Sequence, residues 1–207
     1  MVDVARETPA RVAVVDDDDA ARISLVRLLE VAGYAPCAFD SGAALLESTE
    51  LPVLSCVVTD LQMPGITGLE LQKALTARGI TVPMVFVTAF GTVSAGVHAM
   101  REGAVDFLEK PADPGALLDA VERAVAKGAA LATRAEARAA NRRRVELLTA
   151  RERQVFEGVV QGLPNKQIAA QLGIALKTVK VHRGRVMQKM GADSVADLVR
   201  CAETLGL

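Results

Sequence analysis

The sequence VAVVDDDDA places four aspartates in a row, directly after an apolar run that is typical of a buried strand. Like charges this close repel one another, and burial raises the pKa of a carboxyl group, so the row needs a partner or a function. Asp60, Thr88 and Lys110 follow further apolar runs. In an open parallel sheet, ligands bind beyond the carboxyl ends of the strands. We therefore expect Asp16, Asp17 and these three side chains to meet at one edge of a sheet.

The chemistry that such a cluster supports is phosphoryl transfer to a carboxylate. Three clustered carboxylates are held together by a cation, and ligands that are all oxygen favour Mg²⁺. Asp60 then combines a carboxylate nucleophile with a metal that neutralises charge. Lys110 can pair with phosphoryl oxygens, and the Thr88 hydroxyl can hydrogen bond to one of them. The plainer alternatives are a turn aspartate at position 60 and an ordinary β-branched strand residue at position 88.

The elements that must position these residues alternate along the first half of the chain. Short apolar runs predict strands at residues 11–16, 34–39, 53–59, 84–88 and 104–108. Amphipathic patterns predict helices at residues 20–32, 42–49, 67–78, 92–102 and from 114 onward. This alternation predicts an α/β fold in which helices cover both faces of a parallel sheet. Within the acidic row we expect Asp19 to cap the first helix and Asp18 to be a solvated loop residue.

Charge divides the chain into two parts. Residues 1–122 carry 8 Lys and Arg against 18 Asp and Glu, whereas residues 123–207 carry 16 against 7. The basic part is therefore the candidate for binding nucleic acid. Between the two parts, a stretch rich in Ala and Arg from Gly115 to about Leu148 predicts a long linker helix, with Gly128 as its weak point.

The linker leaves two alternatives open. Small and apolar residues recur at regular spacings, which favour a dimer seam and a solvated linker about equally: Leu117, Val121, Val125, Leu131, Ala135 and Ala139. The arginines at 142–144 are most simply a solvated charge cluster. Contact with phosphate groups is the alternative.

From Thr149 onward the pattern is helical, with helices expected at residues 150–161, 165–172, 176–190 and 194–205. The sequence TARE, which begins at Thr149, predicts a capping box. In the third of these helices Val179, Val186 and Met190 recur at spacings of seven and four, so they should face the core. No acid stands between positions 176 and 192, which leaves a cationic outer face. That arrangement is typical of a recognition helix in the major groove of DNA.

Four motifs resemble the receiver domain of bacterial two-component response regulators: VVDDDD, VVTDLQMPGITGLEL, VFVTAFG and AVDFLEKP. They occur in order, with 43 residues from Asp17 to Asp60, then 28 to Thr88 and 22 to Lys110. The resemblance covers about residues 10–125 and implies a doubly wound, flavodoxin-like (βα)5 fold. It implies that Asp60 is phosphorylated, and that Mg²⁺ is bound by Asp16, Asp17, Asp60 and the main-chain carbonyl of Gln62.

Two phenylalanines complete the expectations for this domain. Phe107 matches the aromatic residue of the family that swings inward when Thr88 moves toward the phosphoryl group, and plain core packing is the alternative for it. Phe90, two residues beyond Thr88, should hinder the approach of water and so slow the loss of the phosphoryl group.

The segment that runs from LTARERQVF to GADSVADLV resembles the LuxR/FixJ-type helix-turn-helix output domain throughout. The resemblance implies base contacts from Lys180, Val181 and either Arg183 or Gly184. It implies phosphate contacts from Lys166, Lys177, Thr178 and Arg185. Phosphate contacts would set affinity and salt dependence, and base contacts would set the choice of sequence.

The two resemblances together imply a response regulator with a receiver at residues 10–125, a helical linker at 126–147 and a DNA-binding domain at 148–207. A sensor histidine kinase would phosphorylate Asp60, and phosphorylation would control dimerisation, binding to promoter DNA and transcription, more as an activator than as a repressor. RNA polymerase and a second copy of the chain are the further expected partners. We expect no enzyme activity.

Two rival functions use the same residues differently. In a phosphatase of the haloacid-dehalogenase type, Asp16 would be the nucleophile and Asp18 the acid-base residue, but the acidic pair that such enzymes need downstream is missing after Lys110. A constitutive DNA-binding protein would use the first domain only to dimerise. The scattered Cys37, Cys56 and Cys201 are expected to be buried thiols in a reducing cytoplasm. The sequence has no run of roughly 20 apolar residues to cross a membrane.

Overall fold

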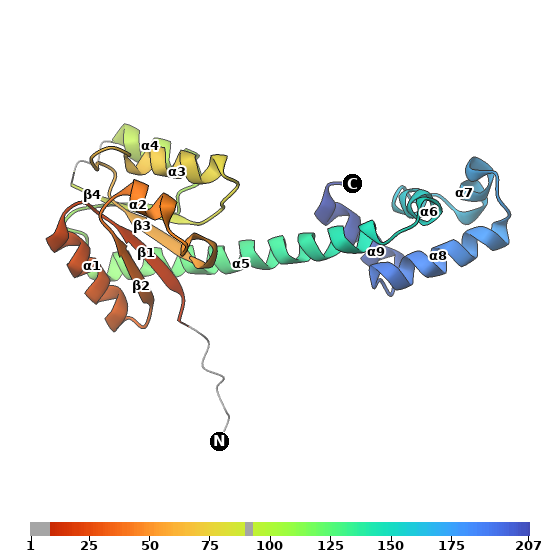
Figure 1. The fold of residues 1–207 in the computed structure, drawn as a ribbon, viewed down its shortest axis with the longest axis horizontal. Coiled ribbons are helices and arrows are strands. Elements are labelled where there is room, and N and C mark those ends of the chain that lie inside the picture. The colour runs from red at the N-terminus through yellow and green to blue at the C-terminus, as the bar shows by residue number, and fades with distance from the viewer. Residues whose placement is uncertain (1–8, 90–92) are drawn as a thin grey trace, which may run out of the picture. The chain divides into compact units, whose positions relative to one another are not determined.

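The computed structural model describes residues 9–89 and 93–207, so the expectation for Phe90 lies outside the described residues. The chain forms two compact units that divide between Leu131 and Ala132 (Figure 1). The first unit combines strands with helices, and the second is helical.

The first unit is built on a five-stranded sheet in which all neighbouring strands are parallel. Its strands are Arg11–Val15 (β1), Ala35–Phe39 (β2), Cys56–Thr59 (β3), Met84–Thr88 (β4) and Asp106–Glu109 (β5). Their order in the sheet is β2-β1-β3-β4-β5. Because the last residues of β1 and β3 pair with each other, and so do those of β4 and β5, the segments that follow these strands leave the sheet at one edge.

Two strands begin later than the sequence indicates. The expected strand 53–59 begins only at Cys56, because Leu51–Val53 forms a 3₁₀ turn (η1). Pro52 begins this turn, where its fixed φ suits a helical start. The strand expected at 104–108 is shifted to Asp106–Glu109, because the amide of Ala104 donates to the Ala99 carbonyl and still belongs to the end of the preceding helix.

Helices cover both faces of the sheet, because successive residues of a strand point to opposite sides. On one face Val12 and Val14 pack with Leu29 of α1 (Asp19–Val31) and with the first turns of α5 (Pro114–Glu146).

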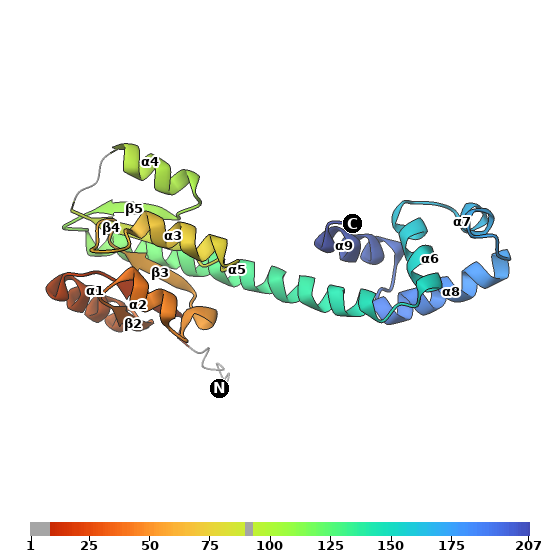
Figure 2. The ribbon, with the colours of Figure 1, turned by 45° about the horizontal axis from the view of Figure 1, so that its top comes forward.

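On the other face Ala13, Val15 and Phe86 pack against three shorter helices: α2 (Gly42–Glu47), α3 (Gly68–Ala77) and α4 (Val93–Arg101). Helices α3 and α4 lie next to each other on this side in both ribbon views (Figure 2). The predicted doubly wound α/β fold is therefore confirmed.

Helix α5 is uninterrupted over its 33 residues. Leu117 and Val121 are buried in the core of the first unit, so half of the expected apolar stripe is not available for a dimer seam. Gly128 is not a weak point. A Cβ at this position would lie 2.4 Å from the carbonyl oxygen of Ser55, so glycine is what lets the helix pass this close to the sheet.

The second unit packs four further helices around one core: α6 (Ala150–Val160), α7 (Asn165–Leu172), α8 (Leu176–Met190) and α9 (Val195–Leu205). The capping box is confirmed, because the Thr149 hydroxyl accepts from the Glu152 amide and the Glu152 carboxylate accepts from the Thr149 amide. Gly173 adopts a left-handed conformation (φ 63°) that ends α7 and turns the chain into α8.

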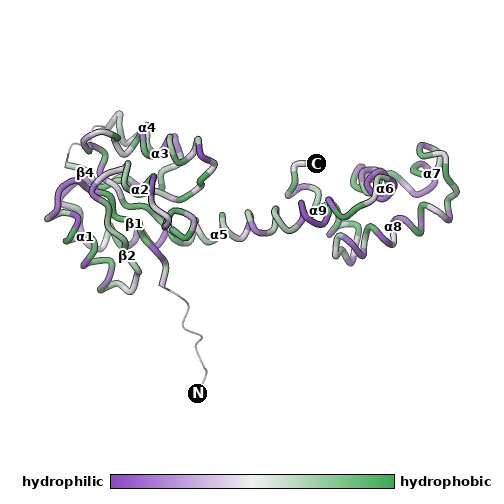
Figure 3. Tube along the Cα trace, viewed as in Figure 1, coloured by the Kyte–Doolittle hydropathy of each residue, from purple (hydrophilic) through white to green (hydrophobic). Residues whose placement is uncertain are grey.

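The hydropathy of the chain follows these cores. The central strands run hydrophobic in Figure 3, whereas α5 mixes hydrophilic and weakly hydrophobic residues after it leaves the sheet. Over residues 9–89 and 93–207, the structure contains no helix with the length and apolar character of a membrane span.

Candidate functional site

The carboxyl ends of β1 and β3 bring three aspartates together. Asp16 follows β1 and is buried, Asp60 follows β3 with its side chain 11% exposed, and Asp17 is exposed. One carboxylate oxygen from each lies within 4.8 Å of the others. The cluster forms because β1 and β3 are neighbours in the sheet, and the structure therefore brings together the acids that the sequence singled out.

Lys110 follows β5 and bridges two of these carboxylates. Its Nζ lies 2.6 Å from Asp16 Oδ2 and 2.7 Å from Asp60 Oδ2. Partial burial of the ammonium acts to lower its pKa, but hydrogen bonds and charge attraction from the two carboxylates outweigh burial, so the pKa of Lys110 is raised above its ordinary value. The lysine stays charged and offsets the repulsion between the acids.

Main-chain amides orient the other oxygens of the two bridged acids. The amide of Asp18 donates to Asp16 Oδ1 at 3.0 Å, and the amide of Gln62 donates to Asp60 Oδ1 at 3.1 Å. Both carboxylates are therefore held from two sides, while Asp17 keeps an exposed carboxylate.

The structure exchanges the roles expected for Asp18 and Asp19. The Asp18 carboxylate accepts from the amides of Ala20 and Ala21 at 2.8 and 3.2 Å, so Asp18 is the N-cap of α1. Hydrogen bonds from the Ala21 and Ala20 amides lower the pKa of Asp18. Asp19 is the first helical residue and pairs with Arg22. The prediction was wrong because a cap needs an extended backbone, and the chain leaves β1 in that conformation at Asp18 (φ −80°, ψ 111°).

Arg22 is a part of the site that the sequence does not single out. Its Nη1 donates to the main-chain carbonyl of Asp16 at 2.6 Å, and the same guanidinium pairs with Asp19. The guanidinium therefore attaches α1 to the loop that carries the metal-type acids. The only sequence signal is the three-residue spacing from Asp19, which is typical of any helical ion pair.

Gly68 holds the loop that follows Asp60. Its amide donates to the Leu61 carbonyl at 2.9 Å. A Cβ on Gly68 would lie 2.3 Å from the Asp60 carbonyl oxygen and 2.9 Å from the ring of Phe86. The start of α3 can approach the site this closely only because the residue has no side chain.

The remaining predicted residues of this unit lie on neighbouring strands. Thr88 ends β4 with its side chain fully buried, and its carbonyl accepts from the Lys110 amide at 2.8 Å. Phe107 on β5 is half-buried, with its ring centroid 6.2 Å from that of Phe86. Gly96 of α4 lies against the other side of the Phe107 ring, since a Cβ there would be 3.5 Å from Cδ1.

The donor set of the acidic site fits a magnesium ion. It consists of hard carboxylate oxygens, with no sulfur or nitrogen in the group of Asp16, Asp17 and Asp60. The exposed carboxylate of Asp17 leaves room for the water ligands that Mg²⁺ usually keeps. The acidic site is therefore of the chemical type that binds this ion.

In the second unit, α8 has a buried and an exposed face. Val179, Val186 and Met190 are fully buried, as their spacing indicates. Of the residues expected at DNA, those that are exposed are Lys166, Lys177, Thr178, Lys180, Val181 and Arg185. The structure therefore gathers most of the predicted cationic face on the outer side of the unit.

Arg183 differs from its neighbours. It is partly buried, and its Nη1 donates to Asn165 Oδ1 at the start of α7 at 2.8 Å. This contact uses one of the five N–H donors of a guanidinium. Gly184 is exposed, and no atom lies within 4 Å of a Cβ built there, so packing does not require glycine at this position.

An ion pair attaches the C-terminal end of α8 to the start of α6. Lys189 Nζ lies 2.6 Å from Glu152 Oε2 and donates to the Leu147 carbonyl at 3.1 Å. The Lys189 hydrogen bond and the Thr149 amide together lower the pKa of Glu152 to about 2. The sequence gives no signal for this pair, because its members are 37 positions apart.

Two family models match the chain: the response regulator receiver domain over residues 12–122 and the bacterial regulatory proteins of the luxR family over residues 146–202. The transcriptional regulatory protein FixJ of Azorhizobium caulinodans is 46% identical over 196 residues, which cover 95% of this chain and 93% of that protein. Nodulation protein W of Bradyrhizobium diazoefficiens is 44% identical, over 97% of this chain and 88% of that protein.

Solved structures give the same result. The response regulator StyR has a TM-score of 0.81 and 42% identity, over 95% of this chain and 99% of that one. Full-length FixJ from B. japonicum has a TM-score of 0.57 and 42% identity, over 97% and 98% of the two chains. With both domains matched in order, the chain belongs to the two-component response regulators that join a receiver to a LuxR-type helix-turn-helix, and it is a DNA-binding transcriptional regulator.

Proposed function

We propose that Asp60 is the phosphoryl acceptor of this regulator and that a sensor histidine kinase is the donor. The observation that carries the proposal is the ammonium of Lys110, which lies 2.7 Å from Asp60 inside a cluster of three carboxylates. In the transfer, a P–O bond to Asp60 forms as the P–N bond to the kinase histidine breaks, and the imidazole leaves. Lys110 then pairs with a phosphoryl oxygen in place of the carboxylate.

Asp16, Asp17, Asp60 and the main-chain carbonyl of Gln62 would hold a magnesium ion. When bound, the ion neutralises the charge that gathers on the phosphoryl oxygens. The chain's own part is to keep Asp16 and Asp60 oriented. It does so through the amides of Asp18 and Gln62.

Thr88 and Phe107 transmit the modification. An added phosphoryl group carries a charge of about −2 near neutral pH, and the Thr88 hydroxyl moves toward it. The ring of Phe107 follows inward, away from Gly96 on α4. The surface that α4, β5 and α5 form changes as a result, which favours a dimer or releases the second unit for binding.

The exposed face of α8 and the start of α7 bind promoter DNA. Lys180 and Val181 face bases, with Arg183 as a third contact once its bond to Asn165 is broken or shared. Phosphates are contacted by Lys166, Lys177, Thr178 and Arg185. Two copies of the unit would meet a two-fold site and act, with RNA polymerase, as an activator.

We also propose the domain limits of residues 10–125 for the receiver, 126–147 for the linker and 148–207 for the DNA-binding domain. The two family matches, over residues 12–122 and 146–202, support these limits. The cytoplasm is the proposed place of action, because the kinase that phosphorylates Asp60 and the promoter are both reached there.

The decisive experiment adds beryllofluoride, a phosphoryl mimic, together with Mg²⁺ to the full chain and follows its mass in solution and its affinity for promoter DNA. We expect a larger mass and tighter binding, and no response in Asp60→Asn. A matched control is Asp40→Asn, because Asp40 is an aspartate outside the cluster.

The rival functions give different results. A constitutive DNA-binding protein would bind equally well as wild type and as Asp60→Asn, with or without the mimic. A phosphatase would release phosphate from small esters over many turnovers. The position of Asp18 as the cap of α1 argues against its use as an acid-base group.

A further inference from the structure

The part of α5 that belongs to the second unit carries three arginines four residues apart: Arg134, Arg138 and Arg142, here called the arginine stripe. All three are exposed. Because residues four apart lie on one face of a helix, with about 6 Å between them along its axis, the three charges form a row.

The arginine stripe has no partner within the described chain. The ion pairs and hydrogen bonds of residues 9–89 and 93–207 include none from Arg134, Arg138 or Arg142. Along the helix, the neighbours of Arg138 at four residues on either side are the other two arginines. Like charges at this spacing destabilise a helix, so the row is unfavourable until an anionic partner binds.

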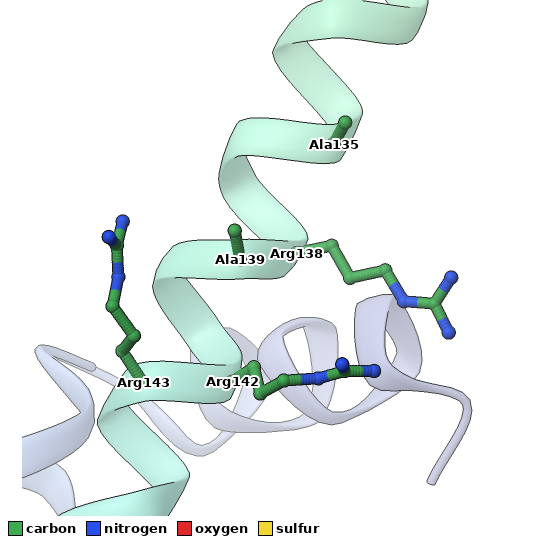
Figure 4. A pocket seen from close by; sticks show the side chains of 5 residues that line it. All are labelled: Ala135, Arg138, Ala139, Arg142 and Arg143. Atoms are coloured by element: carbon green, nitrogen blue, oxygen red, sulfur yellow. The ribbon is translucent and has the colours of Figure 1, made fainter. Parts of the chain in front are cut away.

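The side chains of the stripe border an open depression. It measures about 430 Å³ and is lined by Ala135, Arg138, Ala139, Arg142 and Arg143. Figure 4 shows the guanidinium groups of Arg138 and Arg142 on one side of α5, with Arg143 on the other side. The short alanine side chains leave the two guanidinium groups accessible, and guanidinium is the group that binds phosphate oxygens in a bidentate manner.

The stripe lies next to the end of the recognition helix. Lys189 of α8 donates to the Leu147 carbonyl, just beyond α5, and the Arg144 guanidinium lies 3.5 Å from a Cβ built on Gly191. The C-terminal ends of α5 and α8 meet in both ribbon views. The last turns of α5 therefore lead away from the point where α8 ends, within the same compact unit.

We propose that the arginine stripe binds backbone phosphates of DNA beside the segment that α8 contacts. The inference rests on the proposed DNA-binding face of α8 and extends it by about two phosphate contacts, from Arg138 and Arg142. Such contacts carry no sequence information, so they strengthen binding to every DNA of sufficient length.

The test measures DNA affinity against salt concentration for the full chain with beryllofluoride and Mg²⁺. The probe is a duplex of about 40 base pairs of arbitrary sequence, and a duplex of about 12 base pairs is measured beside it. Arg138→Gln/Arg142→Gln should lower the slope of log affinity against log salt by about 2, or 0.9 for each lost contact. It should do so on the long duplex only. Arg143→Gln, on the other side of the helix, is the matched control.

The outcomes separate this inference from the proposed function. If the wild-type chain binds neither duplex, the proposed function fails. If Lys180→Ala weakens binding while the double glutamine variant keeps the wild-type slope, only the arginine stripe is refuted. An equal loss in Arg143→Gln would also refute it, because the effect would then come from overall charge.

Two further measurements guard the result. Arg138→Lys/Arg142→Lys keeps the charge and should recover most of the slope, whereas a failure to recover would point to a structural role and overturn the inference. If the stripe binds an acidic surface of a second copy instead, the double glutamine variant changes the mass of the protein without DNA and leaves the salt slope as it was.

Discussion

The two charged regions of this regulator differ in where their counter-charges come from. At the sheet edge, Asp16 is 1% exposed and Asp60 is nearly buried, and Lys110 neutralises both from within the chain. On the outer side of α8, Lys180 and Arg185 are exposed and have no printed partner among the residues of the second unit.

This difference separates two ways of using charge. The acidic site is organised before any ligand arrives, so a phosphoryl group needs only to take over an ammonium that is already in place. The cationic face gains its favourable interactions only in the complex, and these must depend on salt. Each of the following variants exchanges one property between the two regions.

The largest effect is expected where the internal counter-charge is removed. Lys110→Met leaves buried Asp16 without its ammonium, so the free energy of unfolding of the first unit should fall by about 1–3 kcal/mol at neutral pH without metal. Mg²⁺ should restore more stability to the variant than to the wild type, because the ion takes over the neutralisation. Urea unfolding followed by circular dichroism measures both quantities.

The matched control for this variant is Lys73→Met, on the exposed side of α3. Unfolding curves of Lys110→Met that coincide with those of the wild type would mean that the acids do not need an internal counter-charge.

A pH-dependent effect is expected at the one ion pair that the second unit shields. The pKa of Glu152 is lowered from 4.5 to about 2 in the folded chain, so its charge stabilises the fold above pH 4.5. That contribution is lost as the pH falls toward 2. Glu152→Gln should therefore flatten the dependence of unfolding on pH in this window, as measured by urea titrations at several pH values. Glu157→Gln, an exposed acid of α6, should retain the wild-type slope.

A smaller effect distinguishes two neighbouring arginines of α8. Arg185→Gln should reduce the slope of log DNA affinity against log salt by about 1, since an exposed arginine is free to bind a phosphate. Arg183→Gln should reduce it less, because this guanidinium is bonded to Asn165. Filter binding over a range of salt concentrations compares the two, and an equal loss would show that the bond to Asn165 is broken in the complex.

The smallest effect concerns the exchanged aspartates. Asp18→Ala removes the cap of α1 and should lower the thermal midpoint of the first unit, whereas Asp19→Ala removes only an exposed pair with Arg22 and should lower it less. The reverse order would return the cap to Asp19.

The sequence predicts the parts of the molecule that depend on local pattern. The five parallel strands and the buried face of α8 follow from apolar periodicity, and the meeting of Asp16, Asp17 and Asp60 follows from the rule that parallel strands end at one edge. These features survive small errors in strand limits, because the polar residue after each strand is unmistakable.

What the sequence misses depends on contacts between distant residues or on a choice among equal ones. Nothing local distinguishes Asp18 from Asp19 as a cap, since both are aspartates and only the exit of the chain from β1 decides. The pair of Glu152 and Lys189 needs the packing of α6 against α8. Gly128 looks like a helix breaker until the carbonyl of Ser55 is seen beside it.

That close approach gives α5 a fixed phase. With backbone against backbone at Gly128, the helix cannot slide or turn at this point without a clash, so the angular position of every later side chain is counted from there. One residue inserted after Leu131 advances all that follows by about 100°, whereas seven residues bring the pattern back to within about 20°. In this chain, helix α5 is read as an angle as much as a length.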